Sequence, residues 1–428
     1  MSEPPPPPPL GIDDGVVLAD PLWARECRAA LSDAPRAVKV LSPCAGLNSP
    51  ERAAREMGLS WETAGDWDVN PALRSTLLRL SRKPELLHVG PRTGDVLSVD
   101  IGSLDLSTDG IVAGPPCPPF SSIGKRLAEL DSRSSVFVTV CAWILHLSTN
   151  GHLCFFILEN VAGITSKRKG DDQSFADWFM EEMYKDLPQG WSIRVVRHNS
   201  SKCLLPQSRP RVFFVGTSAA LTSGRRLRRI SSQPPLSWPA VDLLEFLDPV
   251  PKEEDWASLS VRQQVNLMTN LEQFHKQCSE NPDKEQVAIT DVARDPLKRF
   301  DSGLVVGCTR TLRTNSAYLW ILPSPACTGK FGEKGRFLNR AEKARCAGLR
   351  PESLQDLSDP ECDKAIGNTI PVPLIGTVMF PVLRAWVEHE VMLQEEACAA
   401  ASANCQKGGA TKHHHHHHRR HHHHHHHP

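Results

Sequence analysis

The stretch Ile111–Arg126, IVAGPPCPPFSSIGKR, couples a short apolar run to a loop rich in proline. The run ending at Ala113 predicts a buried strand, and Cys117 follows it by four residues. Each of the prolines around this cysteine fixes its own φ, so the loop holds the thiol in a set direction. Ligands of open α/β sheets bind beyond the carboxyl ends of the strands. The stretch therefore predicts a thiol at a ligand-binding edge, although an incidental cysteine in a stiff connector fits the same residues.

Alternating strand and helix patterns surround this stretch from residue 37 onward. Ser49 is expected to cap a helix that has Pro50 in its first turn and stops at Gly58. Another is expected over 136–147, where apolar residues recur at helical spacing. Strands alternating with helices predict an α/β fold with crossover connections. The expected strands are AVKVL (37–41), WETAGDWD (61–68), GIVAG (110–114), HLCFFILEN (152–160) and RVFFVG (211–216).

The composition is that of an ordinary globular protein, because 40% of the 428 residues are hydrophobic and 23% are charged. The formal net charge is +0, so overall charge gives no argument for a nucleic-acid partner. Two short basic clusters, 167–169 and 225–229, are more often solvated loops than phosphate-binding surfaces. The 13 cysteines are odd in number and contain no C-x-x-C pair. Without a signal-peptide pattern at the N-terminus, these features indicate a reducing intracellular compartment.

Both ends of the chain are of low complexity. The N-terminus reads MSEPPPPPPLG, and a polyproline run cannot form a packed core. Histidines fill most of 413–427, a tract that can bind soft metals loosely, but we expect no catalytic metal site. The longest uncharged stretch, 369–383, is interrupted by prolines, so we expect no transmembrane helix.

Polar residues gather at the ends of the later strands. Glu159 and Asn160 end a buried apolar run, and a carboxylate there can share a pocket with a thiol at the same sheet edge. Gln207, Arg209 and Arg211 lie at spacing two, and alternate residues of a strand face the same way. The two arginines can therefore point into one site. Taken singly, each feature has a plainer interpretation, such as a surface glutamate after a strand or an ordinary turn.

These elements, in this order, resemble the motifs of the cytosine-5 DNA methyltransferase family. GPPCPPFSSIGKR (114–126) resembles the motif that carries the nucleophile, and ENV (159–161), QSRPR (207–211) and the Gly-Asn pair at 367–368 resemble three others. The resemblance covers most of 37–216 and 309–390. It implies an α/β fold, namely a Rossmann-like methyltransferase sheet with an inserted smaller target-recognition region.

The resemblance also implies a division of the chain. The expected parts are a disordered Pro-rich segment over 1–36, a catalytic and cofactor-binding α/β domain over 37–216, a target-recognition region over 217–308, C-terminal motifs that return to the catalytic domain over 309–396, and a low-complexity tail with the His tract over 397–428.

The family's chemistry assigns roles to the polar residues. Cys117 would add as a thiolate to C6 of a cytosine and make C5 nucleophilic. Glu159 would hold N3 of the base, while Arg211, together with Arg209, would contact O2 and the active-site loop. A base inside a duplex would have to be flipped out of the stack. Removal of the C5 proton would fall to a water molecule.

The family takes its methyl group from S-adenosylmethionine, so the resemblance implies a donor site at VLSPCAGLNSPERA (40–53), the place of a glycine-rich turn. Gly46 matches a family glycine, Cys44 stands where another is usual, and Ser42 stands where phenylalanine is usual. Asp66 would bind the ribose hydroxyls and Trp67 would stack on the adenine. The implied donor site comprises Ser42, Cys44, Ala45, Gly46, Leu47, Asp66, Trp67, Asp95, Val96, Pro115, Asn368 and Thr369, with Asp95 reaching the adenine amine.

Three functions fit these patterns. The leading one is a DNA (cytosine-5)-methyltransferase acting on double-stranded DNA, the second is a methyltransferase of tRNA or other RNA, and the third is a catalytically weak nucleic-acid-binding homologue. The altered glycine turn favours the third, whereas an intact Cys117 and Glu159 favour an enzyme. In LNRAEKARCAGL (338–349), which resembles a further motif, Ala341 replaces the usual arginine. We expect an intracellular monomer without membrane attachment, nuclear if the source is eukaryotic.

Overall fold

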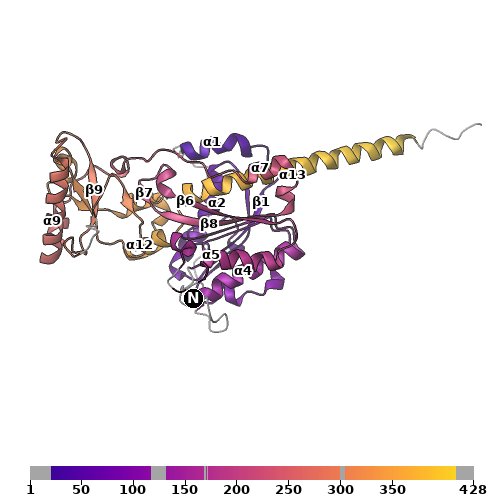
Figure 1. Ribbon diagram of the computed structural model, residues 1–428, viewed down its shortest axis with the longest axis horizontal. Coiled ribbons are helices and arrows are strands. Elements are labelled where there is room, and N and C mark those ends of the chain that lie inside the picture. Colours follow the sequence, from indigo (N-terminus) through magenta and orange to yellow (C-terminus); the bar gives the residue numbers. More distant parts are fainter. Residues whose placement is uncertain (1–20, 117–131, 168–169, 171, 299–303, 411–428) are drawn as a thin grey trace, which may run out of the picture.

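The computed structural model describes residues 21–116, 132–167, 170, 172–298 and 304–410, without the side chains of 132–134 and 405–410 (Figure 1). Its centre is a seven-stranded sheet of order β3-β2-β1-β4-β5-β8-β6. Neighbours among the first five of these strands are parallel, whereas β8 runs antiparallel to both β5 and β6. The strands are β1 Val38–Pro43, β2 Trp61–Asp68, β3 Leu87–Val89, β4 Gly110–Ala113, β5 Phe155–Val161, β6 Ser192–Asn199 and β8 Pro210–Thr217. The predicted Rossmann-like α/β fold is confirmed.

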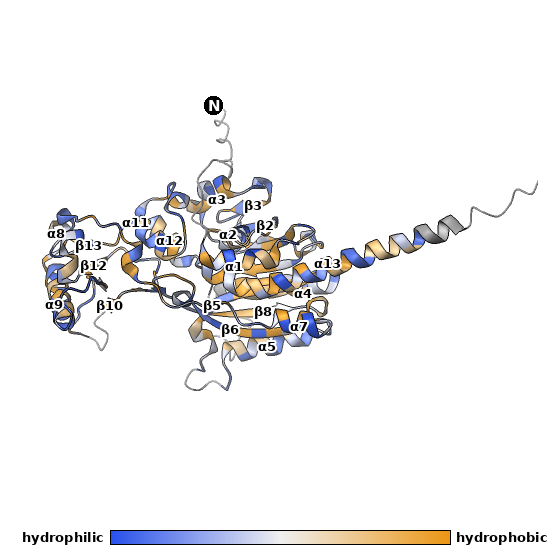
Figure 2. Cartoon of the chain, turned by 90° about the horizontal axis from the view of Figure 1, so that it is seen from above, coloured by the Kyte–Doolittle hydropathy of each residue, from blue (hydrophilic) through white to orange (hydrophobic). Residues whose placement is uncertain are grey.

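Helices cover both faces of this sheet, which is why its central strands are nearly continuous apolar runs. On one face lie α1 (Leu22–Leu31), α2 (Ser49–Glu56) and the first part of α13 (Val372–Ala410), and on the other lie α4 (Ser132–Asn150) and α5 (Phe175–Asp186) (Figure 1). The apolar residues concentrate in these layers (Figure 2). Every residue of β4 is buried, so either face of this strand contributes to a hydrophobic core.

A second, four-stranded sheet of order β10-β9-β12-β13 lies at the end of the molecule opposite the tip of α13 (Figure 1). It consists of β9 (Val287–Asp291), β10 (Val305–Val306), β12 (Leu319–Pro323) and β13 (Arg336–Phe337), with the helix α9 (Val261–Cys278) packed on it. Between the two sheets, β7 (Gln207–Ser208) pairs in parallel with β11 (Thr309–Arg310). The other helices are α3 Arg74–Leu80, α6 Ala219–Thr222, α7 Arg225–Ser231, α8 Glu253–Ser258, α10 Thr328–Phe331, α11 Arg340–Cys346 and α12 Asp359–Asn368.

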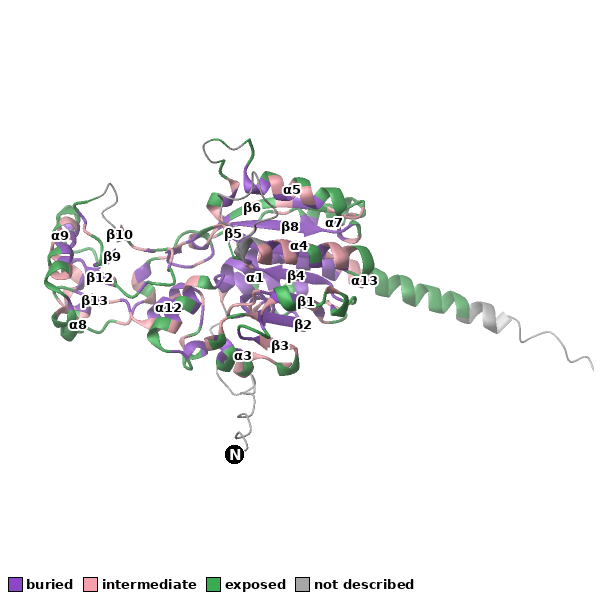
Figure 3. Cartoon of the chain, turned by 90° about the horizontal axis from the view of Figure 1, so that it is seen from below, coloured by how far each residue is buried: buried purple, intermediate pink, exposed green. Residues whose placement is uncertain are grey.

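The structure corrects the predicted segments at both ends. Helix α1 lies inside 1–36, where disorder was predicted, and its apolar residues Trp23, Cys27 and Leu31 are buried against α2 and α13. Their spacing of four residues places them on one helical face, a signal that the polyproline run obscured. Helix α13 continues to Ala410, into the predicted low-complexity tail, and residues 392–404 of it are solvent-exposed (Figure 3).

The second sheet does not end at the predicted boundary of 308. Strands β12 and β13 lie beyond it, within 309–396, yet β12 pairs with β9 and β13 pairs with β12. Strands of two to five residues give too little periodicity to be assigned to one sheet from sequence. Only the pairing in three dimensions shows which segments the second sheet unites.

One helical segment, 359–404, is long and apolar enough to cross a membrane by length and composition, but 94% of its most apolar window is buried inside the protein. That burial is the environment of a core helix. The buried face of α13 includes Trp386, which packs in the same hydrophobic cluster as α1 and α2.

A buried ion pair fixes the smaller sheet to the segments around it. The guanidinium of Arg336, in β13, contacts both carboxylate oxygens of Glu342 at 2.7 and 2.9 Å, and both side chains are almost inaccessible to solvent. Arg336 also donates to the carbonyl oxygens of Asp248 and Val250. Glu342 accepts hydrogen bonds from the backbone N–H groups of Asp248 and Asn339. The pair therefore joins β13, α11 and the 248–250 segment.

Replacing one member of this pair should destabilise the protein strongly. Glu342→Gln removes the negative charge and leaves the buried Arg336 cation without a counter-ion, at a cost of about 3–5 kcal/mol in the free energy of unfolding. Denaturant unfolding followed by intrinsic tryptophan fluorescence measures the change. Glu285→Gln is the matched control, because its ion pair with Lys330 is solvent-exposed and should contribute little to stability. Equal losses in the two variants would contradict this account.

Candidate active site

An ion pair between Glu159 and Arg211 lies where β5 and β8 meet at the edge of the large sheet. The Glu159 Oε1 to Arg211 Nε distance is 2.7 Å, and each side chain is 12% exposed. The register explains the contact, because Arg211 pairs with Val161 and so lies diagonally across from Glu159. The structure thus brings together two of the predicted catalytic residues.

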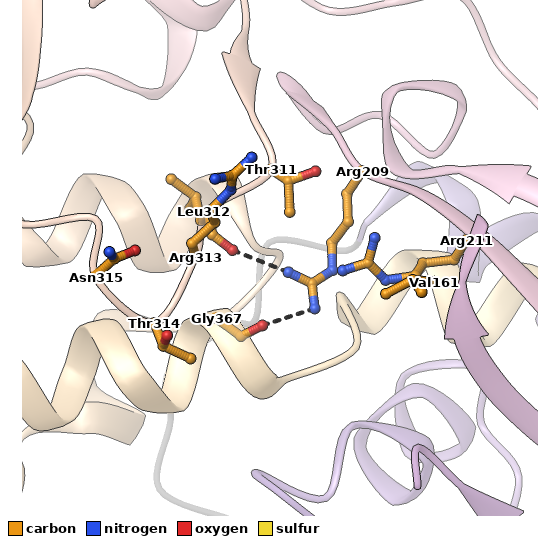
Figure 4. Close-up of a pocket in the computed structure, with 9 residues that line it drawn as sticks. All are labelled: Val161, Arg209, Arg211, Thr311, Leu312, Arg313, Thr314, Asn315 and Gly367. Atoms are coloured by element: carbon orange, nitrogen blue, oxygen red, sulfur yellow. Dashed lines mark hydrogen bonds between the residues drawn. The ribbon is translucent and has the colours of Figure 1, made fainter. Parts of the chain in front are cut away.

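Arg209, also predicted to be catalytic, is buried and has a different role. Its Nη1 donates to the carbonyl oxygen of Leu312 at 3.1 Å, and its Nη2 donates to that of Gly367 at 2.9 Å (Figure 4). Burial, with a smaller effect from the Arg211 charge, lowers the pKa of Arg209 to about 10, and the Glu159 charge opposes that shift. The residue therefore stays cationic at neutral pH and joins β7, the 312 region and α12.

A cavity of about 520 Å³ opens beside these arginines (Figure 4). Its lining residues are Val161, Arg209, Arg211, Thr311, Leu312, Arg313, Thr314, Asn315 and Gly367. They come from β5, from the two strands that carry the Gln-x-Arg-x-Arg pattern, from the 311–315 segment and from the end of α12. The cavity therefore lies between the large sheet and the segments that lead to the smaller one.

Cys117, the predicted nucleophile, lies outside the described residues, but the chain is described up to Pro116. Asn160 Nδ2 donates to the carbonyl oxygen of Pro115 at 3.5 Å, so the side chain after Glu159 contacts the start of the proline loop. A Cβ on Gly114 would lie 3.4 Å from Glu159 Oε2 and 3.5 Å from Ile370 Cδ1. The backbone that enters the Cys117 loop thus passes directly beside the Glu159 carboxylate.

The predicted donor turn after β1 contains three left-handed residues. Cys44, Gly46 and Asn48 have φ angles of 59°, 55° and 54°. Only glycine adopts this conformation without a steric cost, so the departures from glycine fall at Cys44 and Asn48. A Cβ on Gly46 would lie 3.9 Å from Thr369 Oγ1, so the turn and the C-terminal motif lie close together, as predicted for Thr369.

The turn differs in two details from its predicted form. Asn48, not Ser49, is the N-cap of α2, and Ser49 is its first residue. Gly367 and Asn368 end helix α12, whereas the turn before α13 follows at 369–371. Asn368 is solvent-exposed and Thr369 is buried.

Acidic residues surround Cys44. Burial, followed by the charges of Asp68 and Asp95, raises the pKa of the Cys44 thiol to about 12. This cysteine is therefore a neutral thiol at physiological pH. The predicted donor residue Asp95 lies near the turn, as expected, and its carboxylate accepts from Leu97 N at the start of a short helix.

Asp68 is an acidic residue that contacts the backbone of the donor turn, and sequence reasoning missed it. Its Oδ2 accepts from Gly46 N at 2.9 Å, and its Oδ1 accepts from Asn70 N. Burial raises the pKa of Asp68, while these two N–H groups oppose the shift. The signal available in the sequence was its position as the last residue of β2, directly before an Asn-Pro turn.

The side chain of the predicted ribose ligand Asp66 is buried and contacts the side chain of Asn48. Its Oδ2 accepts from Asn48 Nδ2 at 3.0 Å, and the same amide donates to Glu51 Oε2 at 2.8 Å, so one side chain holds two buried carboxylates. Burial, and then the charge of Glu51, raise the pKa of Asp66 well above its usual range. Asp66 thus belongs to a buried polar cluster beneath the turn.

The other predicted donor residues are mostly part of the core. Trp67 is buried, stacks on His88 with ring centroids 5.0 Å apart and meets Trp143 edge to face. These contacts place it on the face of β2 opposite Asp66 and Asp68, because successive strand residues alternate. Ser42, Leu47, Val96 and Pro115 are also buried, while Ala45 and Gly46 are partly accessible.

The raised pKa of Asp66 predicts a pH-dependent stability. A carboxyl whose pKa is higher in the folded state stabilises the fold at low pH, and that contribution is lost as the pH rises toward the raised value. Asp66→Asn keeps an acceptor for Asn48 without a titratable proton. In thermal unfolding, we expect the stability advantage of this variant over the wild type to grow as the pH rises from about 4, the ordinary pKa of an aspartate, toward the raised pKa of Asp66.

Asp105→Asn is the control for this measurement. Burial tends to raise the pKa of Asp105, but hydrogen bonds from Lys39 and Ser107 lower it to about 2. Its carboxyl is therefore ionised in folded and unfolded chains alike above about pH 5, so its effect on stability should be constant over that range. A pH-independent difference for Asp66→Asn would contradict the buried, protonated acid.

Comparison with known proteins agrees with this geometry. Type II methyltransferase M.DdeI of Desulfomicrobium norvegicum is 36% identical over 151 residues, so the match spans 35% of this chain and only 34% of that protein. Type II methyltransferase M1.BsuMI of Bacillus subtilis is 23% identical over 360 residues, which are 78% of this chain and 77% of that protein. A crystal structure of DNMT2 from Spodoptera frugiperda shares the fold, with a TM-score of 0.52 at 15% identity over 83% of this chain and 100% of that one.

The family of C-5 cytosine-specific DNA methylases matches residues 87–381, which include β4 with the proline loop, the Glu159 and Arg211 strands and the Gly-Asn pair. The match covers more than half of the chain. This chain therefore belongs to the C-5 cytosine-specific DNA methylase family.

Proposed function

We propose that this protein transfers a methyl group from S-adenosylmethionine to C5 of a flipped-out cytosine in double-stranded DNA. The observation that carries the proposal is the Glu159–Arg211 pair, whose arginine lines a cavity of about 520 Å³ and whose carboxylate lies beside the backbone that leads to Cys117. A carboxyl and a guanidinium side by side match the N3 and O2 edge of cytosine. The cavity lies at a sheet edge, where ligands of α/β proteins bind.

The chemistry follows from these residues. The Cys117 sulfur forms a bond to C6, and the electron pair of the C5–C6 double bond shifts so that C5 can attack the methyl group of the donor sulfonium, whose S–CH3 bond would break to leave a neutral thioether. Glu159 holds N3 of the base, while Arg211 offsets the negative charge that develops on the ring at O2. After methyl transfer, a water removes the C5 proton, and the electron pair left at C5 expels the Cys117 thiolate. The ring then recovers its double bond.

The residues beneath the catalytic edge fit a methyl donor. S-adenosylmethionine supplies an activated methyl group, and its adenosine needs acceptors for hydroxyl groups and room beside the backbone. Asp68 offers a carboxylate at the turn, Gly46 leaves the backbone open, and Thr369 Oγ1 is a buried hydroxyl without a partner in the described part of the chain. Gly114 lies beside both Ile370 and Glu159, so the proposed donor site and the catalytic edge are close together. We assign the ribose hydroxyls to Asp68 in place of Asp66.

Trapping the covalent intermediate tests the reaction. Duplex DNA that contains 5-fluorocytosine cannot lose a proton from C5, so the wild type incubated with labelled S-adenosylmethionine should form a labelled, denaturant-resistant adduct. Cys117→Ala should abolish the adduct, and Glu159→Gln should slow its formation by about 10²–10⁴-fold. A parallel reaction with tRNA separates the DNA from the RNA substrate. An adduct that persists in Cys117→Ala, or none on DNA, would overturn the proposal.

Donor affinity distinguishes the two aspartates at the end of β2. Asp68→Asn should weaken S-adenosylmethionine binding by about 10- to 100-fold, because a charged hydrogen bond is lost at the turn. Asp66→Asn should leave the affinity unchanged, since Asp66 contacts Asn48 inside the protein. Isothermal titration calorimetry measures both. A larger loss of affinity in Asp66→Asn than in Asp68→Asn would assign the ribose contact to Asp66.

A further inference from the structure

The 311–315 segment forms a rigid wall of the cavity. Thr311 Oγ1 donates to the carbonyl oxygen of Ser208 at 3.0 Å, and Leu312 is buried and accepts from Arg209. The Ser316 hydroxyl accepts from Arg313 N at 2.7 Å and donates to Arg313 O at 2.9 Å, which closes the turn. The backbone of this wall is therefore held on both sides.

Helix α12 presses against the same backbone. A Cβ on Gly367 would overlap the backbone atoms of Arg313 and Thr314, so only glycine permits this approach. Arg209 donates to the Gly367 carbonyl and the Leu312 carbonyl together, which locks the helix end to the wall. A backbone fixed by a helix and a buried guanidinium presents its side chains with little freedom to lose on binding.

The side chains that this wall presents are polar and available. Arg313, Thr314 and Asn315 are exposed and line the cavity, across from Arg211 in Figure 4. In the described part of the chain, neither the Arg313 guanidinium nor the Asn315 amide has a side-chain partner, whereas Arg211 is paired with Glu159. A guanidinium can donate two hydrogen bonds to the edge of a guanine, and a side-chain amide can form two hydrogen bonds with the edge of an adenine.

We propose that Arg313 and Asn315 determine sequence preference by reading the bases that flank the target cytosine, with Arg313 binding a guanine and Asn315 an adenine. The inference rests on the proposed function, since it places DNA at the cavity. These residues line the same cavity as Arg211, the ion-pair partner of Glu159, so what they touch lies next to a base held by that pair. Contacts to base edges require side chains in a defined geometry, whereas contacts to phosphates require mainly charge. The fixed backbone of this turn therefore favours base-edge contacts.

The test is methylation of a duplex library with random bases on both sides of one cytosine, read by sequencing as a rate for every flank. The wild type should prefer a flanking guanine and a flanking adenine. Arg313→Ala should lower the rate on the preferred guanine flank by about 10- to 100-fold and leave the other flanks nearly unchanged. Arg313→Lys should lose the same preference while it keeps the salt dependence, because lysine retains charge without the fork. Asn315→Ala should flatten the adenine preference alone.

Arg310→Ala is the matched control, because Arg310 is an exposed arginine of β11, directly before the 311–315 segment, and does not line the cavity. Its flank profile should equal that of the wild type. A uniform loss over all flanks in Arg313→Ala, with a salt slope reduced by about one, would identify a phosphate contact and overturn the inference. An unchanged profile would overturn it as well. A wild type that methylates DNA without flank preference refutes this inference alone, whereas one that methylates no DNA refutes the proposed function and this inference with it.

Discussion

One buried guanidinium, that of Arg209, joins three segments that lie far apart in the sequence. It sits between β7 and β8 and donates to carbonyl oxygens of Leu312 and Gly367. A cation taken out of water must be hydrogen-bonded, and a carbonyl deprived of its donor carries a similar cost. The wall at 311–315, the end of α12 and the strand that carries Arg211 therefore depend on one another. The cavity exists because these three segments are held at this spacing.

The Arg336 guanidinium joins separate segments in the same way beside the smaller sheet. Arg336 binds the Glu342 carboxylate and two carbonyl oxygens of the 248–250 segment, while Arg209 binds carbonyl oxygens alone. The Arg336 site is a neutralised pair, whereas Arg209 keeps its positive charge close to the cavity. Burial lowers the pKa of Arg209 only to about 10, so that charge is present at neutral pH. The cavity thus offers fixed positive charge to a negatively charged ligand.

The donor side and the catalytic side meet at Gly114. A side chain there would contact Glu159 on one side and Ile370 on the other, and Ile370 directly follows Thr369. The backbone leading to Cys117 therefore passes between the carboxyl proposed to hold the base and the hydroxyl proposed to close the donor site. On the donor side, the Asn48 amide spans Glu51 and Asp66, so the left-handed turn is held from within the protein. The contact of Asp68 with Gly46 holds it from the other side.

The sequence predicted strands more reliably than it predicted which acidic side chain faces the turn. The strand over 61–68 was predicted with the bounds that β2 has, yet the pattern did not indicate that Asp68 contacts the Gly46 backbone while Asp66 contacts the Asn48 side chain. Both residues face the same way, because they are two apart. What separates them is how far each extends past the end of β1, and that depends on the parallel register between the strands.

The sequence by itself determined the α/β class, the order of the catalytic motifs and the family, because apolar periodicity and motif spacing are properties of the chain alone. It missed α1, whose few apolar residues become informative only when α2 and α13 supply the surface that buries them. Only the tertiary structure decided that β12 and β13 join β9, that Arg209 is an anchor and Arg211 the partner of Glu159, and that 311–315 lines their cavity. The physical reason is that pairing and burial join residues that lie far apart in the sequence, and no local pattern records those contacts.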